Sequence, residues 1–259
     1  MGFVFQLYSF RHIFAFCLVF GTIVTFAPLL HAADDKPLKI KVGTTSFPPF
    51  YVVNQDQTAS GIYLDIIEKT LQHAGLDYRL DIYPTKRLYR NLGNGGTDLF
   101  LGIKGSPEYD KNVFYSSTVI SQIQMRIYAI GDTPLPETKE DLNNHKIITM
   151  RGYGYGGLVS YFSNPTNNIK VTSTSKHRAS FLMLKDKRAD YVINYKQPSD
   201  TALANIEIPN LKYTNFYDAK VYFIISKGTP HAEIVLKKLE TAYLELIDSG
   251  ELEYIPNDD

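Results

Sequence analysis

The sequence of 259 residues contains no tryptophan and a single cysteine, Cys17. Because that cysteine lies in an N-terminal apolar run, the rest of the chain must fold without a disulfide bond, which its length and its hydrophobic share of 44% allow. An excess of charge is also missing, since 27 basic residues balance 27 acidic ones and no basic block occurs. This balance argues against nucleic acid or an anionic membrane surface as the main partner.

Patterns for metal binding and for nucleophilic catalysis are missing as well. The four histidines beyond the N-terminal run are scattered without metal-ligand spacing: His73, His145, His177 and His231. No Gly-x-Ser-x-Gly turn of the kind that exposes a nucleophilic serine is present. We therefore predict a protein with no metal, no cofactor and no enzymatic activity.

What the chain does contain begins with a segment typical of export. Arg11 precedes the apolar run Ile13 to Leu30, which gives way to small residues around Ala32. A positive start, an apolar body and small residues at its end describe a secretory signal, predicted as residues 1–32. The body is long enough that an uncleaved membrane anchor is the alternative. Phe16 before Cys17 argues against a lipid anchor, which needs a small residue there.

After this segment, short apolar strands alternate with amphipathic helices. Strands are expected over three stretches: Leu38 to Val42, Tyr78 to Tyr83 and Asp98 to Ile103. A helix opened by Gly61 and a second helix that contains Arg87 lie between them, a pattern that predicts βαβ units with a parallel sheet. Ligands of such sheets bind beyond the carboxyl ends of the strands. Those ends predict a site formed by three segments: Thr44 to Phe50, Tyr83 to Arg87 and Ile103 to Ser106.

A second, similar unit follows the turn cluster Gly131 to Pro136, which is a candidate domain boundary. A long strand over Thr118 to Ile130 precedes the cluster, and a later apolar strand is expected over Val221 to Ser226. Thr229 as N-cap and Pro230 at the first helical position predict the start of a long final helix. That helix has no partner within the second unit, so the chain is expected to return to the first domain.

Three stretches in order, VGTTSFPPF, GIYLDIIEKTLQHAG and GGTDLFLGIKGSPEY, are similar in sequence and spacing to the periplasmic solute-binding proteins of family 3. Two later stretches, DLNNHKIITMRGYGYG and LKDKRADYVIN, extend the resemblance into the second unit. The resemblance implies an α/β fold of the two-lobed periplasmic binding protein-like type (type II). Each lobe would be a mainly parallel sheet flanked by helices, with two crossover strands. Lobe 1 would comprise residues 33–128 and 219–259, and lobe 2 residues 129–218.

Proteins of this family are the binding components of ABC transporters for polar amino acids, so the resemblance also implies a role. The chain would be a periplasmic, monomeric, non-enzymatic protein that captures a small polar solute and presents it to a membrane permease. Two alternatives on the same scaffold stay open. One is an exported dehydratase-like enzyme, for which Glu108 is the obvious acidic candidate. The other is a sensor partner that reports its ligand to a membrane receptor.

The positions at which this family holds an amino acid differ in this chain. Tyr109 stands where the resemblance implies an arginine for the α-carboxylate, and tyrosine cannot supply the bidentate cationic fork that a carboxylate prefers. Asn194 and Tyr195 stand where an acidic residue would hold the ammonium group. A free α-amino acid bound in the family's usual way is therefore disfavoured.

Candidate ligand-binding residues lie at the ends of the predicted strands. Phe47 is where the resemblance implies an aromatic platform, although it could simply pack beside the two prolines that follow it. Arg87 and Lys104 could equally face the cleft or the solvent. Tyr195 ends a strand near the predicted cleft, and Tyr217 is a further, weaker candidate.

The glycine-rich turn Arg151 to Gly157 joins a strand to a helix, so its backbone N–H groups could bind an anion or a carbonyl oxygen. Its spacing superficially matches a dinucleotide fingerprint, which we discount because an exported chain meets little NAD. Arg151 could supply the cationic fork that Tyr109 lacks, and Tyr153 lies in the same turn.

The three cations Arg87, Lys104 and Arg151 are thus predicted to converge on a solute that carries a carboxylate or another acceptor-rich group. Closure is expected as a hinge motion through the crossover strands, near Arg126 to Ile130 and Ala219 to Tyr222. Arg151→Ala is predicted to abolish the thermal stabilisation by ligand and to leave the unliganded midpoint nearly unchanged.

Overall fold

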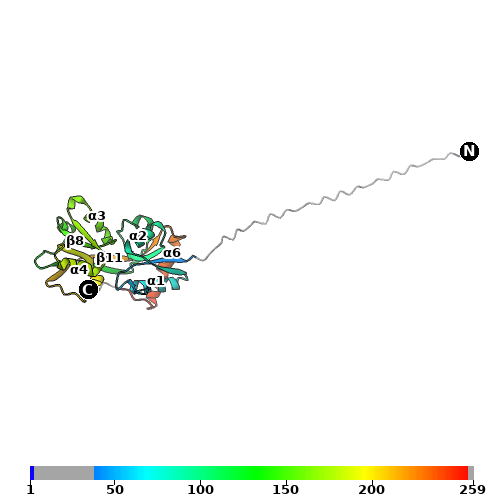
Figure 1. Cartoon of the computed structure of the whole chain (residues 1–259). Helices are drawn as coiled ribbons and strands as arrows, with labels where there is room; N and C mark the ends of the chain where they lie inside the picture. The colour runs from blue at the N-terminus through cyan, green and yellow to red at the C-terminus, as the bar shows by residue number, and fades with distance from the viewer. Residues whose placement is uncertain (3–37, 256–259) are drawn as a thin grey trace. The chain divides into compact units, whose positions relative to one another are not determined.

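The structure, a computed structural model, describes residues 1–2 and 38–255. Residues 3–32 of the predicted export signal, with its anchor alternative, lie outside the described residues. In the described ranges, none of the helices combines the length and the apolar character that crossing a membrane requires. Residues 38–255 form two lobes, which Figure 1 shows as two groups of helices and strands.

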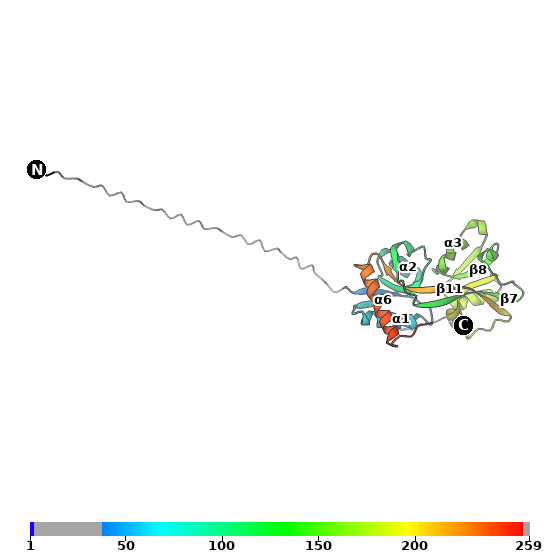
Figure 2. The ribbon, with the colours of Figure 1, turned by 180° about the vertical axis from the view of Figure 1, so that it is seen from behind.

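Lobe 1 is built on three parallel strands and two crossover helices: β1 (Ile40–Thr44), α1 (Ile62–His73), β4 (Tyr78–Ile82), α2 (Thr85–Asn94) and β5 (Leu99–Ile103). A short hairpin of β2 (Val52–Val53) and β3 (Ala59–Ser60) precedes α1. β1 lies between β4 and β5, so the chain moves from β1 to one neighbour and then back past β1 to the other. Right-handed crossovers in opposite directions place α1 and α2 on opposite faces of the sheet, as Figures 1 and 2 show.

Lobe 2 repeats this pattern with its own strands and helices: β8 (Lys146–Met150), α3 (Leu158–Phe162), β9 (Lys170–Thr174), α4 (His177–Lys185), β10 (Tyr191–Tyr195) and α5 (Lys196–Leu203). Again the first strand, β8, is central and pairs in parallel with β9 and β10. A small separate core around Phe181 stabilises this lobe. The loops after β1 and after β8 therefore occupy equivalent places in the two lobes.

Two long antiparallel strands join the lobes, β7 (Ser121–Ile130) and β11 (Leu211–Ser226). β7 pairs with β10 of lobe 2, whereas the end of β11 pairs with β5 and with β6 (Val113–Tyr115) of lobe 1. One sheet thus runs through both lobes in the order β4-β1-β5-β11-β7-β10-β8-β9, and Figure 2 shows β11 between the lobes. The sheet is mixed, because the crossover strands run antiparallel to their neighbours. The predicted lobe boundaries fall within β7 and β11.

The second crossover strand is longer than the sequence indicated. β11 begins at Leu211 rather than at Val221, and its first half carries alternating polar residues with one side exposed. The strand was predicted from its apolar run, which covers only its buried second half. The first half is exposed on one side, so polar residues interrupt its sequence and no apolar run marks it. The register shifts at a bulge between Asn215 and Tyr217.

The final helix, α6 (Ala232–Asp248), packs against α1, so the chain returns to lobe 1. Its predicted start was wrong by two residues, because His231 occupies the N-cap with φ of 55°. Thr229 instead donates its hydroxyl hydrogen to the buried carboxylate of Asp98, 2.9 Å away. The side chain expected to cap the helix is therefore used inside the core of lobe 1.

Candidate functional site

The loop after β1 is built into the core of lobe 1. Backbone hydrogen bonds in both directions close the turn between Phe47 and Tyr51, at 2.8 and 2.9 Å. Phe50 is 2% exposed and stacks on Tyr63 with ring centroids 4.3 Å apart. Phe47 stacks on Phe50 in turn, at 5.5 Å, and so projects from a fixed base toward lobe 2.

The loop after β8 is held in a different way. The hydroxyl of Tyr155 accepts the N–H of Met150 at 2.6 Å and donates to the carbonyl oxygen of Ile193 at 3.1 Å, so it ties β8 to β10. Around this anchor the backbone is in the left-handed region, with φ of 49° at Tyr155 and 62° at Gly156. Glycine permits this conformation at little cost. The loop thereby presents Tyr153 to lobe 1.

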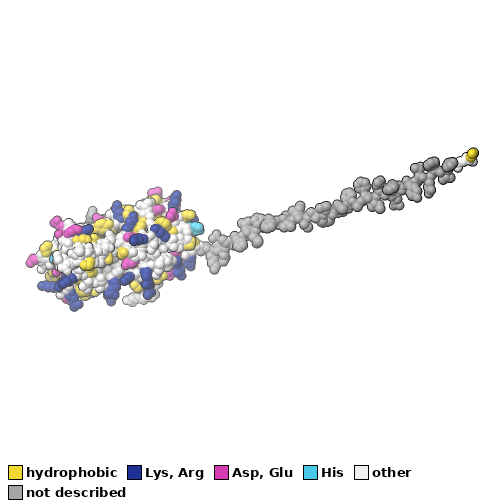
Figure 3. Space-filling view, turned by 90° about the horizontal axis from the view of Figure 1, so that it is seen from above, with side chains coloured by type: hydrophobic (Ala, Val, Ile, Leu, Met, Phe, Trp, Pro, Cys, Tyr) yellow, Lys and Arg dark blue, Asp and Glu magenta, His cyan; other side chains and the backbone are white. Residues whose placement is uncertain are grey.

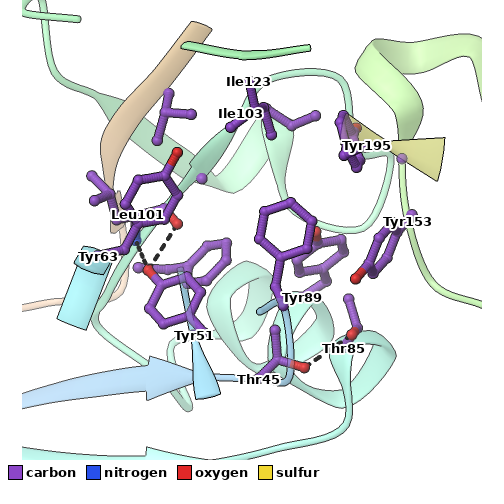
Figure 4. Close-up of a pocket in the computed structure, with 15 residues that line it drawn as sticks. Thr45, Tyr51, Tyr63, Thr85, Tyr89, Leu101, Ile103, Ile123, Tyr153 and Tyr195 are labelled. Atoms are coloured by element: carbon purple, nitrogen blue, oxygen red, sulfur yellow. Dashed lines mark hydrogen bonds between the residues drawn. The ribbon is translucent and has the colours of Figure 1, made fainter. Parts of the chain in front are cut away.

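A cavity lies where the two loops meet, and Figure 4 shows the fifteen residues that line it. Lobe 2 contributes three of them: Tyr153, Gly154 and Tyr195. The others belong to lobe 1 and the crossover strands: Thr45, Phe47, Tyr51, Tyr63, Thr85, Tyr89, Phe100, Leu101, Gly102, Ile103, Ile123 and Val221. The cavity therefore has a deep wall in lobe 1 and a small lid from lobe 2.

The volume of the cavity is about 40 Å³, which suffices for a few water molecules. Three rings close it. Phe47 meets Tyr153 at 5.8 Å and Tyr195 at 5.6 Å, edge to face in both contacts. Pockets for small ligands usually measure hundreds of cubic ångströms. A solute the size of an amino acid thus requires these rings or the lobes to move apart.

The hydroxyl groups of the cavity differ in how fully they are paired. The hydroxyl of Tyr51 donates to the carbonyl oxygen of Leu101 at 2.9 Å and accepts its N–H at 3.2 Å (Figure 4). Thr45 and Thr85 share one hydrogen bond of 2.9 Å. No hydrogen bond joins the hydroxyl of Tyr89 or of Tyr195 to another described residue. These two hydroxyls therefore keep their full hydrogen-bonding capacity among the described residues.

A neutral histidine backs the lid. Nε2 of His177, at the start of α4, lies 3.3 Å from the hydroxyl of Tyr153, and Nδ1 lies 3.1 Å from the side-chain oxygen of Asn194. Burial lowers the pKa of His177 to about 4, although the hydrogen bond to Asn194 acts in the opposite direction. Burial also raises the pKa of Tyr153 and of Tyr195. The lid is therefore uncharged at neutral pH.

The structure brings together three of the six predicted ligand-binding residues, Phe47, Tyr153 and Tyr195, but not the three cations. Arg87 and Arg151 are exposed and line neighbouring surface hollows that both include Glu108. Lys104 is also exposed, and its ammonium lies over the ring of Tyr222 at 4.3 Å, in a different hollow. The predicted convergence of the cations is thus not found.

The reason is the direction of neighbouring side chains. Leu88 and Tyr89 occupy the buried face of the first turn of α2, which turns Arg87 outward. Ile103 lines the cavity, and Lys104, the next residue along, points away from it. Both signs of charge are spread over the face of the molecule shown in Figure 3.

Two further positions singled out in the sequence do not line the cavity. Tyr109 is buried, donates its hydroxyl hydrogen to the carbonyl oxygen of Ile103 at 2.5 Å and meets the ring of Tyr89 edge to face at 4.9 Å. It therefore supports a lining residue from behind. Glu108 is exposed and accepts a hydrogen bond from the hydroxyl of Ser106 at 2.8 Å.

Sequence reasoning missed several lining residues, among them Thr45, Thr85 and Tyr89. The first two lie in the segments predicted to form the site, so the segments were identified but not the side chains. Tyr89 follows Thr85 by four residues in α2 and thus shares its helix face, a spacing that could have identified it. No group of three or more metal-ligating side chains occurs in the described part of the chain.

The profile of the bacterial extracellular solute-binding proteins, family 3, matches residues 40–257 of the chain. No curated protein sequence matches it. Among solved structures, a histidine kinase sensor domain similar to periplasmic binding proteins superimposes with a TM-score of 0.68 and 15% identity, over 83% of this chain and 93% of that chain. Arginine-binding protein ArgBP from T. maritima, in its holo form, gives 0.63 and 20%, over 84% and 97%. The substrate-binding protein of an amino acid ABC transporter gives 0.63 and 20%, over 82% and 95%. These likenesses confirm the predicted two-lobed α/β fold.

Proposed function

Since the chain belongs to the bacterial extracellular solute-binding proteins of family 3, we propose that it is exported and captures a small polar solute for an ABC-type importer. One observation carries the proposal. The only residues of lobe 2 that line the cavity, Tyr153, Gly154 and Tyr195, sit opposite a wall of lobe 1 at the carboxyl ends of the parallel strands. Such an edge is where ligands of open α/β sheets bind. The permease would recognise the closed form of a monomer.

Capture proceeds by closure of the lobes around the solute. The solute first meets the wall of lobe 1 around Phe47, and Tyr153 and Tyr195 of lobe 2 then cover it. β7 and β11 act as the hinge, and the bulge between Asn215 and Tyr217 supports this role, because it interrupts the regular pairing of the two crossover strands. The solute shifts the balance toward closure only because it binds the closed form better.

The exposed cations act from outside the cavity in this proposal. Arg87 and Arg151, in neighbouring hollows beside the loop after β8, do not line the cavity, and their charge would steer a solute only if that solute carried negative charge. Such steering acts over about a Debye length and weakens with salt. Lys104 lies near the crossover strands, where its charge already faces two aromatic rings.

The test is a thermal-shift screen of the purified protein against amino acids, organic acids, small peptides and sugars. A solute at one hundred times its dissociation constant stabilises the folded state by about 2.7 kcal/mol, so the midpoint rises. Phe47→Ala should reduce that rise for the best solute, whereas Tyr254→Ala, at an exposed position outside the cavity, should not. If no solute class raises the midpoint, capture of a small solute is not the function.

A second candidate function follows from the likeness to the histidine kinase sensor domain. The same closure would then report the solute to a membrane receptor instead of delivering it. Uptake of labelled solute by cells with and without the protein separates the two roles, because only a transport component changes uptake. We propose no enzymatic role, because the family to which the chain belongs is one of solute-binding proteins.

A further inference from the structure

The lining of the cavity is uncharged, and this property narrows the class of solute. No aspartate, glutamate, lysine, arginine or histidine is among the fifteen described residues that line it. Its side chains are aromatic, aliphatic or hydroxyl-bearing. We propose that the cavity binds an uncharged solute that has a flat or ring-shaped apolar face and a few hydroxyl or amide groups. This inference rests on the solute-binding function proposed above.

An ion would enter this cavity at a large loss of affinity. Burying a charge without a partner weakens binding by more than about a hundredfold, because the lost hydration is not replaced. Arg151 is exposed in a surface hollow, and Tyr153 borders both that hollow and the cavity. An exposed ion pair returns at most about a fivefold gain. The cations outside the cavity cannot offset the burial of an anion.

A cationic solute is also expected to bind weakly in this cavity. The rings of Phe47, Tyr89 and Tyr195 could face an ammonium group, and a desolvated cation–π contact contributes roughly a thirtyfold gain. That gain is still smaller than the loss on burial, because no carboxylate lines the cavity. The polar partners behind the lid, His177 and Asn194, are neutral as well.

An uncharged polar group, by contrast, meets suitable partners. The hydroxyls of Tyr89 and Tyr195 have no partner among the described residues, and each can both donate and accept a hydrogen bond. The hydrogen bond between Thr45 and Thr85 uses one of their two hydroxyl hydrogens, so the other can be donated to a solute. Hydroxyls of this kind match the hydroxyl and amide groups of a neutral solute, and the surrounding rings match its flat face.

Two series of probes, each matched in size, test the proposal by calorimetry on the purified protein. One series is benzamide, benzoate and benzylammonium, and the other is glucose, glucuronate and glucosamine. The uncharged member of at least one series should bind at least about tenfold tighter than its ions, with an affinity that high salt leaves unchanged. The proposal is overturned if an ion binds as tightly as its neutral counterpart, or if neither uncharged member binds.

The result also distinguishes this proposal from the function on which it rests. Tight binding of a charged solute, such as a free amino acid, would overturn the uncharged-solute proposal and uphold capture. Absence of binding by every charged and uncharged compound in the wider screen would overturn both.

Two variants locate the polar contacts within the cavity. Tyr89→Phe and Tyr195→Phe should each weaken binding of the neutral solute about 3–10-fold, because each removes one hydroxyl that has no partner inside the protein. Folding should not change, since no internal hydrogen bond is lost. Tyr254→Phe, at an exposed site outside the cavity, is the matched control. Unchanged affinity in both cavity variants would show that these hydroxyls do not contact the solute.

Discussion

The loops after β1 and after β8 occupy equivalent places in the two lobes, yet they are built differently. Each presents an aromatic ring to the cavity, Phe47 from lobe 1 and Tyr153 from lobe 2. The first loop is closed by backbone hydrogen bonds and packed on Phe50 and Tyr63, whereas the second is rich in glycine and anchored by Tyr155. One topology thus supplies both a wall that is packed within lobe 1 and a lid whose buried ring also meets Phe47 of the other lobe.

The largest difference between the loops should appear in folding stability. Phe50→Ala removes a ring that is 2% exposed, so it should lower the free energy of unfolding by about 3–5 kcal/mol. Tyr153→Ala should cost less, about 1–3 kcal/mol, because one of its ring contacts, with Phe47, is lost whenever the lobes part. Chemical denaturation measures both. Equal losses would mean that the ring of the lid stabilises the folded chain as much as the ring of the wall does, which would contradict this expectation.

The pH dependence of stability should reveal His177, the half-buried histidine behind the lid. The pKa of His177 is about 4 in the folded chain and 6.5 when unperturbed. As pH falls from 6.5 toward 4, the unfolded chain takes up a proton that the folded chain does not, so stability falls. The folded chain should lose about 1–3 kcal/mol less unfolding free energy between pH 6.5 and pH 4 when it carries His177→Gln. Above pH 6.5 the substitution should change this pH dependence little. An unaltered profile in denaturation at several pH values would show that His177 titrates normally in the folded chain.

Closure itself should depend on a contact between backbones. A Cβ on Gly105, where φ is 97°, would overlap the backbone of Gly156 and Gly157 in lobe 2. Gly105→Ala should therefore reduce the closed population tenfold or more, a shift of about 1.4 kcal/mol. Distances between spin labels on the two lobes measure this population.

Gly131→Ala is the control for the strain that alanine brings at a positive φ. Gly131 has φ of 62° and nothing within 4 Å of an added Cβ, so its variant should share the strain but not the clash. If both variants keep the same distribution of distances, the contact at Gly105 does not limit closure.

The smallest effect is expected at the surface. Arg151→Ala should change the unliganded stability by less than about 0.5 kcal/mol, because the side chain is exposed. The sequence predicts that this variant abolishes the thermal response to solute, whereas the position of Arg151 outside an uncharged cavity predicts an unchanged response at low and at high salt. A thermal-shift titration at two salt concentrations decides between these expectations.

The sequence predicted the segments of the site better than its side chains. Strand ends are visible as apolar runs that stop, and parallel strands bring those ends to one edge, so Phe47, Tyr153 and Tyr195 could be predicted as neighbours. Which of two adjacent residues faces the cavity depends on the residue at which the strand ends or the helix begins, because neighbouring side chains point in different directions. Arg87 and Lys104 differ from the lining residues Thr85 and Ile103 by only one or two positions. The cations were predicted as site residues because of their charge, although the residues that line the cavity carry hydroxyl groups, aromatic rings or aliphatic side chains.

The edge-to-face contact of Phe47 with Tyr153 and Tyr195 has a kinetic consequence. In the closed arrangement the space is filled by these rings, so an arriving molecule finds the wall covered until thermal motion separates the halves. Encounters become productive only during those intervals. At high concentration the observed rate of association should therefore level off at the opening rate and stop rising with concentration. The contacts among these three aromatic rings would then limit the opening rate, and with it the highest rate at which the protein can capture a solute.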